Sequence, residues 1–195
     1  MSDPLPLSDA AVRLASILTF ADSEGGPLIA MSERALADWL GVYDAMGTAI
    51  YGNAPCDYDR ACGAAPCELI DVGGAQAIAL ETPDNGTLIA QPDGALIVRW
   101  IGANDAATLM SAALAVDDVD FEEQPGDYVH DGTDLVLFDS ASSGTRLDRK
   151  RAASVELPAG TYAMTLLGEW SGPVLGSDDA PHDTMVQVLR LRRRP

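Results

Sequence analysis

The sequence predicts an α+β protein, rich in β-strands, with antiparallel sheets and two or three short helices. Short apolar runs recur along the chain, and Gly, Pro, Asn or Asp separates them, which is typical of strands joined by turns. Hydrophobic residues make up 47% of the 195 residues, enough to bury a sizeable core. We therefore expect residues 1–195 to form a single compact domain.

The first elements lie between residues 14 and 40. Residues 14–21 fit either a strand or a short helix. The sequence SEGG at 23–26 predicts a tight turn, because glycine adopts positive φ, and PLIAM at 27–31 predicts a strand. Ser32 is a candidate N-cap for a helix over residues 33–40.

The rest of the chain predicts mostly strands. Residues 45–66, rich in Gly, Pro, Ala and Cys, are expected to form a loop, and 146–151 a basic loop. The apolar spacing after Asn104 predicts a helix over 104–115. Apolar runs predict strands at 67–72, 75–81, 86–90, 95–101, 134–139, 154–157, 161–170 and 184–192.

Two segments resemble each other at an offset of 58 residues. AIALETPDNGTL at 77–88 aligns with LVLFDSASSGTR at 135–146. One interpretation is a pseudo-repeat of two β-rich halves, 1–103 and 116–195, joined by the helix at 104–115. The alternative is chance similarity between two short β-turn-β units.

Charge is the strongest compositional signal. Thirty acidic residues face twelve basic ones, a net charge of −18. Residues 1–148 carry 25 acids and five Arg, whereas 149–195 carry five acids and seven bases. Such a field repels nucleic acid and anionic membranes and accelerates encounter with basic partners. The alternative is that the acidity only maintains solubility.

Several functional classes have no support in the sequence. No apolar run reaches the roughly 18 residues of a membrane helix, and the N-terminus lacks the pattern of a signal peptide, so we expect a cytoplasmic protein. No phosphate-binding, zinc-protease or serine-hydrolase motif occurs. We therefore expect no enzyme activity, no cofactor and no metal. His130 and His182 are expected in exposed loops, with a hydrolase role as the alternative.

Arg99 is the one charge inside an otherwise apolar strand. Because Leu96, Val98 and Trp100 alternate with it, we expect Arg99 on the solvent side of a sheet. The alternative is an ion pair with an acid of the segment DYDRAC, since an unpaired buried charge is costly.

The first half of the chain contains a series of motifs: SEGGPLIAM, ADWLG, CDYDRAC, AIALETPDNGTL and LIVRWIGAND, in this order. Their marked positions are Gly25, Gly26, Pro27, Leu28, Trp39, Gly41, Asp57, Tyr58, Arg60, Ala61, Cys62, Arg99 and Trp100. This series resembles the immunity protein 21 family of bacterial polymorphic-toxin systems. We expect these positions to be fold determinants.

The resemblance implies a protein that neutralises a cognate toxin by binding it, without chemistry. The toxin domain is expected to be basic, since many such toxins are nucleases. Residues 117–139 hold nine acids and no Lys or Arg, so the sequence places the contact surface there. Its candidate residues are Asp117, Asp118, Asp120, Glu122, Glu123 and Asp127.

A second hypothesis comes from another class of protein. It is a small-molecule-binding or regulatory β-domain without catalytic activity, whose pocket lies between the two halves. Trp100 and Trp170 are the candidates for lining such a pocket.

Overall fold

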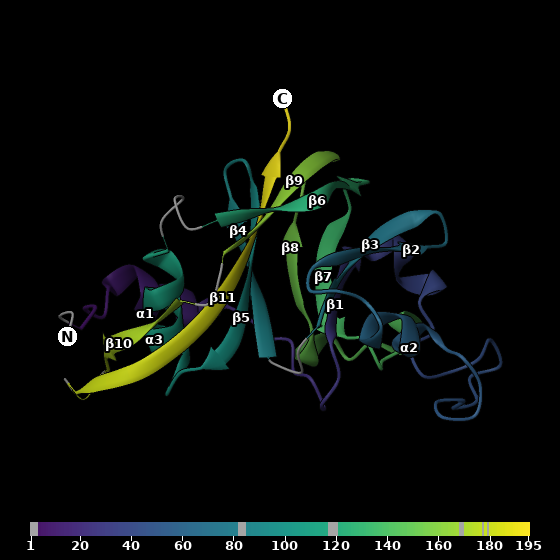
Figure 1. The fold of residues 1–195 in the computed structure, drawn as a ribbon, viewed down its shortest axis with the longest axis horizontal. Coiled ribbons are helices and arrows are strands. Elements are labelled where there is room, and N and C mark those ends of the chain that lie inside the picture. Colours follow the sequence, from purple (N-terminus) through teal and green to yellow (C-terminus); the bar gives the residue numbers. More distant parts are fainter. Residues whose placement is uncertain (1–3, 82–84, 117–120, 168–169, 177, 179) are drawn as a thin grey trace.

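Two antiparallel β-sheets dominate the computed structural model, which describes residues 4–81, 85–116, 121–167, 170–176, 178 and 180–195 (Figure 1). The five-stranded sheet has the order β2-β3-β1-β7-β8, with bounds β1 Leu28–Ser32, β2 Glu68–Val72, β3 Ala75–Leu80, β7 Asp134–Asp139 and β8 Ala153–Glu156. The six-stranded sheet has the order β4-β5-β11-β9-β6, with β10 paired to β11; its bounds are β4 Asn85–Gln91, β5 Gly94–Gly102, β6 Phe121–His130, β9 Gly160–Leu167, β10 Trp170–Leu175 and β11 Pro181–Arg193.

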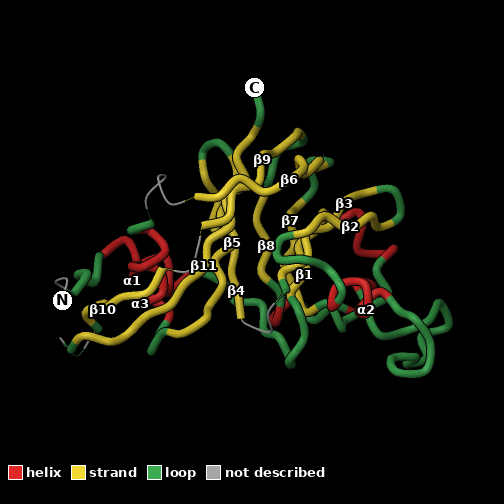
Figure 2. The backbone as a smooth tube through the Cα atoms, viewed as in Figure 1, coloured by secondary structure: helices red, strands yellow, loops and turns green. Residues whose placement is uncertain are grey.

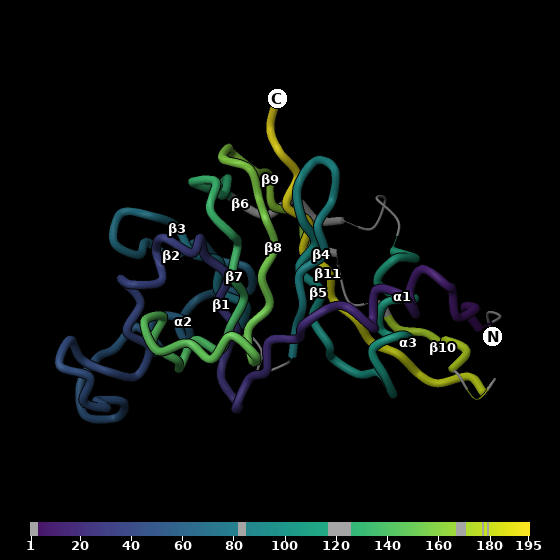
Figure 3. The backbone as a smooth tube through the Cα atoms, turned by 180° about the vertical axis from the view of Figure 1, so that it is seen from behind, coloured from purple at the N-terminus to yellow at the C-terminus, as the bar shows by residue number. Residues whose placement is uncertain are grey.

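The two sheets pack against each other around a shared apolar core. Strands β4 and β8 run side by side where the sheets approach, as the view from behind shows (Figure 3). The side chains between the sheets come from both of them and include Leu28, Ile78, Leu80, Leu137, Ile97, Tyr162, Met164 and Leu189. This core joins strands that lie far apart in the sequence.

Helices cover the outer face of each sheet. On the five-stranded sheet, the 3₁₀ helix η1 (Glu33–Asp38) and the helix α2 (Asp57–Cys62) cover a core that contains Trp39 and Phe138. On the six-stranded sheet, α1 (Asp9–Ile17) and α3 (Ala106–Leu114) cover a core that contains Leu109 and Val188. Figure 2 shows these two helical groups at opposite sides of the sheets. The central parts of both sheets are therefore buried on both faces, which explains why strands such as β1, β5 and β7 read as continuous apolar runs.

Each half of the chain contributes to both sheets. Strands β4 and β5 of the first half join the six-stranded sheet, and β7 and β8 of the second half join the five-stranded one. The aligned glycines of the pseudo-repeat lie in different settings: Gly86 pairs within β4, and Gly144 begins the 3₁₀ helix η3 (Gly144–Arg146). A duplication of the halves remains a prediction.

The predicted fold class is confirmed, and most strands lie where the apolar runs placed them. The helix predicted at 104–115 is α3, capped by the Asp105 side chain, which accepts the Thr108 N–H at 2.8 Å. The ambiguous segment 14–21 is helical only as far as Ile17, where α1 ends.

Three local predictions were wrong in whole or in part. DYDRAC is the helix α2 instead of a loop, because the Asp59 carboxylate reaches back and accepts the Cys56 N–H at 2.9 Å, closing the first turn. Ser32 occupies the predicted N-cap position, but the helix that follows is the 3₁₀ helix η1 and the Ser32 side chain makes no capping hydrogen bond. The predicted strand at 161–170 is divided between β9 and β10.

Arg99 is buried, with 3% of its surface exposed, so the predicted solvent side was wrong. The alternation along β5 is as predicted: Leu96 and Val98 face the α1–α3 core, while Ile97 faces the core between the sheets. Because the five-stranded sheet covers the face on which Arg99 lies, both faces of β5 are dry. Its guanidinium donates a hydrogen bond to Gln187 Oε1 on the neighbouring strand β11.

We predict that Ile97→Ala lowers the free energy of unfolding by about 2–5 kcal/mol, because it opens a cavity in the core between the sheets. Ile97 is fully buried, and the matched control Ile17→Ala removes the same atoms from a side chain that is 76% exposed. Chemical denaturation of both variants measures the difference. Equal losses for the two variants would show that the core between the sheets contributes little.

Candidate functional site

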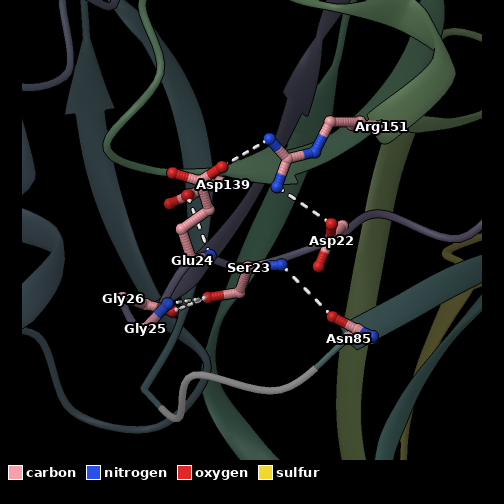
Figure 4. Close-up of polar contacts among 8 residues, drawn as sticks. All are labelled: Asp22, Ser23, Glu24, Gly25, Gly26, Asn85, Asp139 and Arg151. Atoms are coloured by element: carbon pink, nitrogen blue, oxygen red, sulfur yellow. Dashed lines mark hydrogen bonds and ion pairs between the residues drawn. The ribbon is translucent and has the colours of Figure 1, made fainter.

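The Gly-Gly turn leads from Ala21 into β1 and is held by its own side chains (Figure 4). Ser23 Oγ donates to the Gly26 carbonyl and accepts the Gly25 N–H at 3.2 Å. Gly25 has φ +110°, a conformation that L side chains rarely adopt. A Cβ on Gly26 would lie 2.5 Å from Tyr58 Cε2, so only glycine lets the α2 ring pack against the turn.

Asp139 at the end of β7 anchors this turn to the five-stranded sheet. Its Oδ2 accepts the Glu24 N–H at 3.2 Å, and its Oδ1 accepts the Ala141 N–H at 3.0 Å. The carboxylate is largely buried, and both oxygens have donors. One side chain therefore fixes the turn before β1 and the loop after β7 in the same place.

Trp39 and Gly41 both contact the loop at residues 140–144. Trp39 Nε1 donates to the Ser140 carbonyl at 2.9 Å, and the Trp39 carbonyl accepts the Gly144 N–H at 2.9 Å. Gly41 has φ +63°, and a Cβ there would lie 2.4 Å from the Ala141 carbonyl oxygen. The separation of Trp and Gly by one residue lets the two positions contact the same loop.

Helix α2 completes the arrangement. Asp57 Oδ2 accepts the Leu40 N–H at 2.8 Å, and the Asp57–Arg60 ion pair closes at 3.0 Å. Arg60 also donates to the Asp71 carbonyl on the edge strand β2. Burial raises the pKa of Tyr58 to about 12, and a hydrogen bond with Cys62 adds to that shift. The tyrosine is thus held neutral against the Gly-Gly turn.

The structure brings most of the motif residues together at one end of the five-stranded sheet. Arg99 and Trp100 lie apart from them on β5, where the Trp100 ring packs edge-on against Phe20 with centroids 5.4 Å apart. Trp100 Nε1 donates to the Ala103 carbonyl at 3.2 Å. The Trp170 side chain lies outside the described part of the structure.

Sequence reasoning missed Asp139 and Arg151 as members of this cluster. Arg151 bonds Asp22 at 2.9 Å and Glu24 at 2.5 Å, which fastens the turn to the basic segment before β8. Two features of the sequence could have indicated them. Asp139 lies at the end of an apolar run, and Arg151 belongs to a basic run in an acidic chain. These residues wall a polar pocket of about 290 Å³, whose further lining includes Tyr43, Arg146 and Asp148.

The predicted contact residues are described only in part. Asp117, Asp118 and Asp120 lie outside the described residues, and Glu122 and Glu123 are described through their backbone, which pairs with Leu166 and Thr165 of β9. Asp127 forms an ion pair with Arg194 at 2.9 Å. Part of this acidic stretch is thus the strand β6, which the sequence did not indicate.

The two histidines have defined partners. His130 is buried on β6, which overturns the predicted exposed loop: its Nδ1 lies 3.1 Å from the Tyr128 hydroxyl and its Nε2 lies 2.7 Å from the Thr133 carbonyl. His182 lies between Asp178 at 2.9 Å and Asn104 at 2.6 Å. The hydrogen bond from His182 lowers the pKa of Asp178.

The cysteines are free thiols, of which Cys56 and Cys67 are buried and Cys62 is exposed. Burial raises the pKa of Cys67 to about 11, so this thiol is protonated at neutral pH. Among the described residues, no three metal-binding side chains gather into a group. The helices of the described segments are all too short or too polar to cross a membrane.

Comparison with known proteins places this fold and its motif cluster in a defined class. A family model described as Immunity protein 21 matches residues 19–173, a span from the segment before the Gly-Gly turn into β10. The chain therefore belongs to the immunity protein 21 family, and its role is that of an immunity protein. No curated protein and no solved structure matches the chain.

We predict that Gly26→Ala lowers the free energy of unfolding by about 1–3 kcal/mol, because the new methyl group meets the Tyr58 ring. In a Tyr58→Ala background the same substitution should lower the free energy of unfolding clearly less, because the ring that the methyl group would meet is absent. Gly102→Ala is the control, because its Cβ would meet nothing closer than Met185 Cβ at 3.8 Å. Chemical denaturation of the double-mutant cycle measures the coupling, and equal costs in both backgrounds would contradict it.

Proposed function

We propose that this protein neutralises a cognate bacterial toxin domain by binding it directly, without catalysing a reaction. Family membership carries the proposal, because the matched family is one of immunity proteins. The net charge of −18 supports a basic toxin as the partner. The proposal places the encounter in the cytoplasm of the cell that makes both proteins.

The charge distribution supports binding by electrostatic attraction. The excess of acids lies before residue 149, where 25 acids face five Arg. The basic C-terminal strand end is engaged within the molecule: Arg192 pairs with Asp93 at 3.2 Å, and Arg194 with Asp127. A field of this sign accelerates association with a cationic protein and opposes binding to nucleic acid or an anionic membrane.

The contacts of the histidines favour binding over catalysis. Both ring nitrogens of His130 have polar partners inside the fold, and His182 lies between Asp178 and Asn104. A general base must present a nitrogen to a substrate proton. These two imidazoles instead connect segments of the protein, His130 within the β6–β7 hairpin and His182 between β11 and the loop after β5.

The contact surface remains the acidic stretch predicted from the sequence, with Asp117, Asp118, Asp120, Glu122, Glu123 and Asp127. The ion pair with Arg194 partly compensates the charge of Asp127, so the test below leaves Asp127 unchanged. Exposed charges at the edge of an interface act mainly on the association rate, and salt screens them.

We expect that co-expression of this protein rescues cells from the toxin encoded by the neighbouring gene. Direct binding should also be visible as a stable complex of the two purified proteins, whose affinity isothermal titration calorimetry measures. Growth arrest despite full expression of soluble protein would refute the neutralising role. An unrelated toxin from another system is the specificity control.

The acidic surface is tested by neutralising its other five members. We expect D117N/D118N/D120N/E122Q/E123Q to lower the association rate about tenfold at low salt and to flatten its salt dependence. The control D9N/D71N/E81Q/E156Q/D183N changes the net charge equally at exposed positions elsewhere. Stopped-flow measurements at several salt concentrations compare them. Equal effects of the two variants would show that only the overall charge matters.

A further inference from the structure

A loop between η1 and α2, residues 42–56, extends from the body of the molecule (Figures 1 and 3). Met46 is 87% exposed and Tyr51 is 57% exposed. Loops of this length inside a compact fold are usually functional, and neighbouring exposed apolar side chains mark interaction sites. The motif cluster supports the base of this loop, because Gly41 and Asp57 adjoin it.

The loop has a defined conformation. Asp44 Oδ1 accepts the Met46 and Thr48 N–H groups at 2.9 and 2.8 Å, and Tyr43 and Ala49 form an antiparallel bridge. The Arg146 guanidinium lies 5.7 Å from the centre of the Tyr43 ring. A loop that is ordered before binding loses less entropy when it meets a partner. The exposed side chains of this loop are thus presented from a preorganised support.

A hollow of about 530 Å³ lies beside Tyr51, lined by Tyr51, Gly52, Asn53, Ala54, Pro55 and Asp59. The Tyr51 ring is fixed edge-on against Tyr58, with centroids 5.1 Å apart. The Asp59 carboxylate is oriented by the Cys56 N–H on its Oδ2. An aromatic ring and a carboxylate on one small concavity are the groups that recognise an ammonium or guanidinium.

The charged residue that lines the hollow is Asp59. Asp57 follows the loop directly and is paired with Arg60, whose guanidinium also donates to the β2 edge. Arg146 packs against another part of the loop, at Tyr43, and does not line the hollow. The hollow itself is therefore complementary to a cationic side chain and unfavourable for an anionic one.

We infer that residues 42–56 are a docking surface for the toxin, on which a Lys or Arg side chain of the toxin occupies the hollow between Tyr51 and Asp59. Met46, elsewhere on the same loop, supplies an exposed apolar side chain. The inference rests on the proposed function, and it names a surface separate from the acidic stretch at 117–127. Tyrosine and arginine are enriched among the residues that dominate binding energy at interfaces.

The test compares two variants in the hollow with two matched variants on α1. Tyr51→Ala removes the ring, and Asn53→Lys places a competing ammonium in the hollow; each should weaken toxin binding about tenfold or more in calorimetry. Ile17→Ala and Ile17→Lys make comparable changes at an exposed apolar residue that lies on the six-stranded sheet's side of the molecule. These controls should bind within about twofold of the unchanged protein. Thermal unfolding checks that all four variants fold.

The outcomes separate this inference from the proposed function. Binding by the unchanged protein together with loss in both hollow variants supports the docking surface. Unchanged affinity in both hollow variants, or equal losses for Asn53→Lys and Ile17→Lys, overturns it and leaves toxin binding intact. If the unchanged protein itself does not bind the toxin, the proposed function fails, and this inference fails with it.

Discussion

The burial of the central strands on both faces is the constraint on which the rest of the structure depends. Helices on the outside and the opposing sheet on the inside leave β1 and β5 no solvent-exposed face, so apolar residues occupy successive positions in them. Charged residues consequently lie in strands with an exposed side, such as β2, and in loops. Arg99 is an exception, and its burial requires polar contacts such as the one with Gln187 on the next strand.

The loops at one end of the five-stranded sheet are held by a few shared polar anchors. Asp139 binds the turn before β1 and the loop after β7, and Trp39 binds that same loop from η1. Glycine is required where backbones or rings approach closely, as at Gly26 and Gly41. These contacts join the turn before β1, the loop after β7 and the segment around Trp39 into one support. The exposed loop at 42–56 begins directly after Gly41, which packs against that support.

Ion pairs within the molecule engage several of its acidic residues. Arg151, Arg192 and Arg194 each bond acids from distant parts of the chain, and these bonds fasten β8 and the end of β11 to their neighbours. Exposed pairs of this kind contribute little stability individually. Each pair engages one basic residue together with one acid, so the net charge of −18 is unchanged.

The sequence by itself determined the β-rich fold class, the position of most strands, the helix α3 and the family, because these depend on local periodicity, turn residues and short motifs. It did not determine which faces are dry. The side of β5 that carries Arg99 was expected in solvent and is buried, since only the packing of a second sheet decides it. Strand β6 escaped detection because its acids obscure the alternation, and its pairing with β9 is made across the sequence. Only the tertiary structure brought Gly26, Trp39, Tyr58 and Asp139 together, because a motif specifies which residues are present and the fold specifies which of them meet.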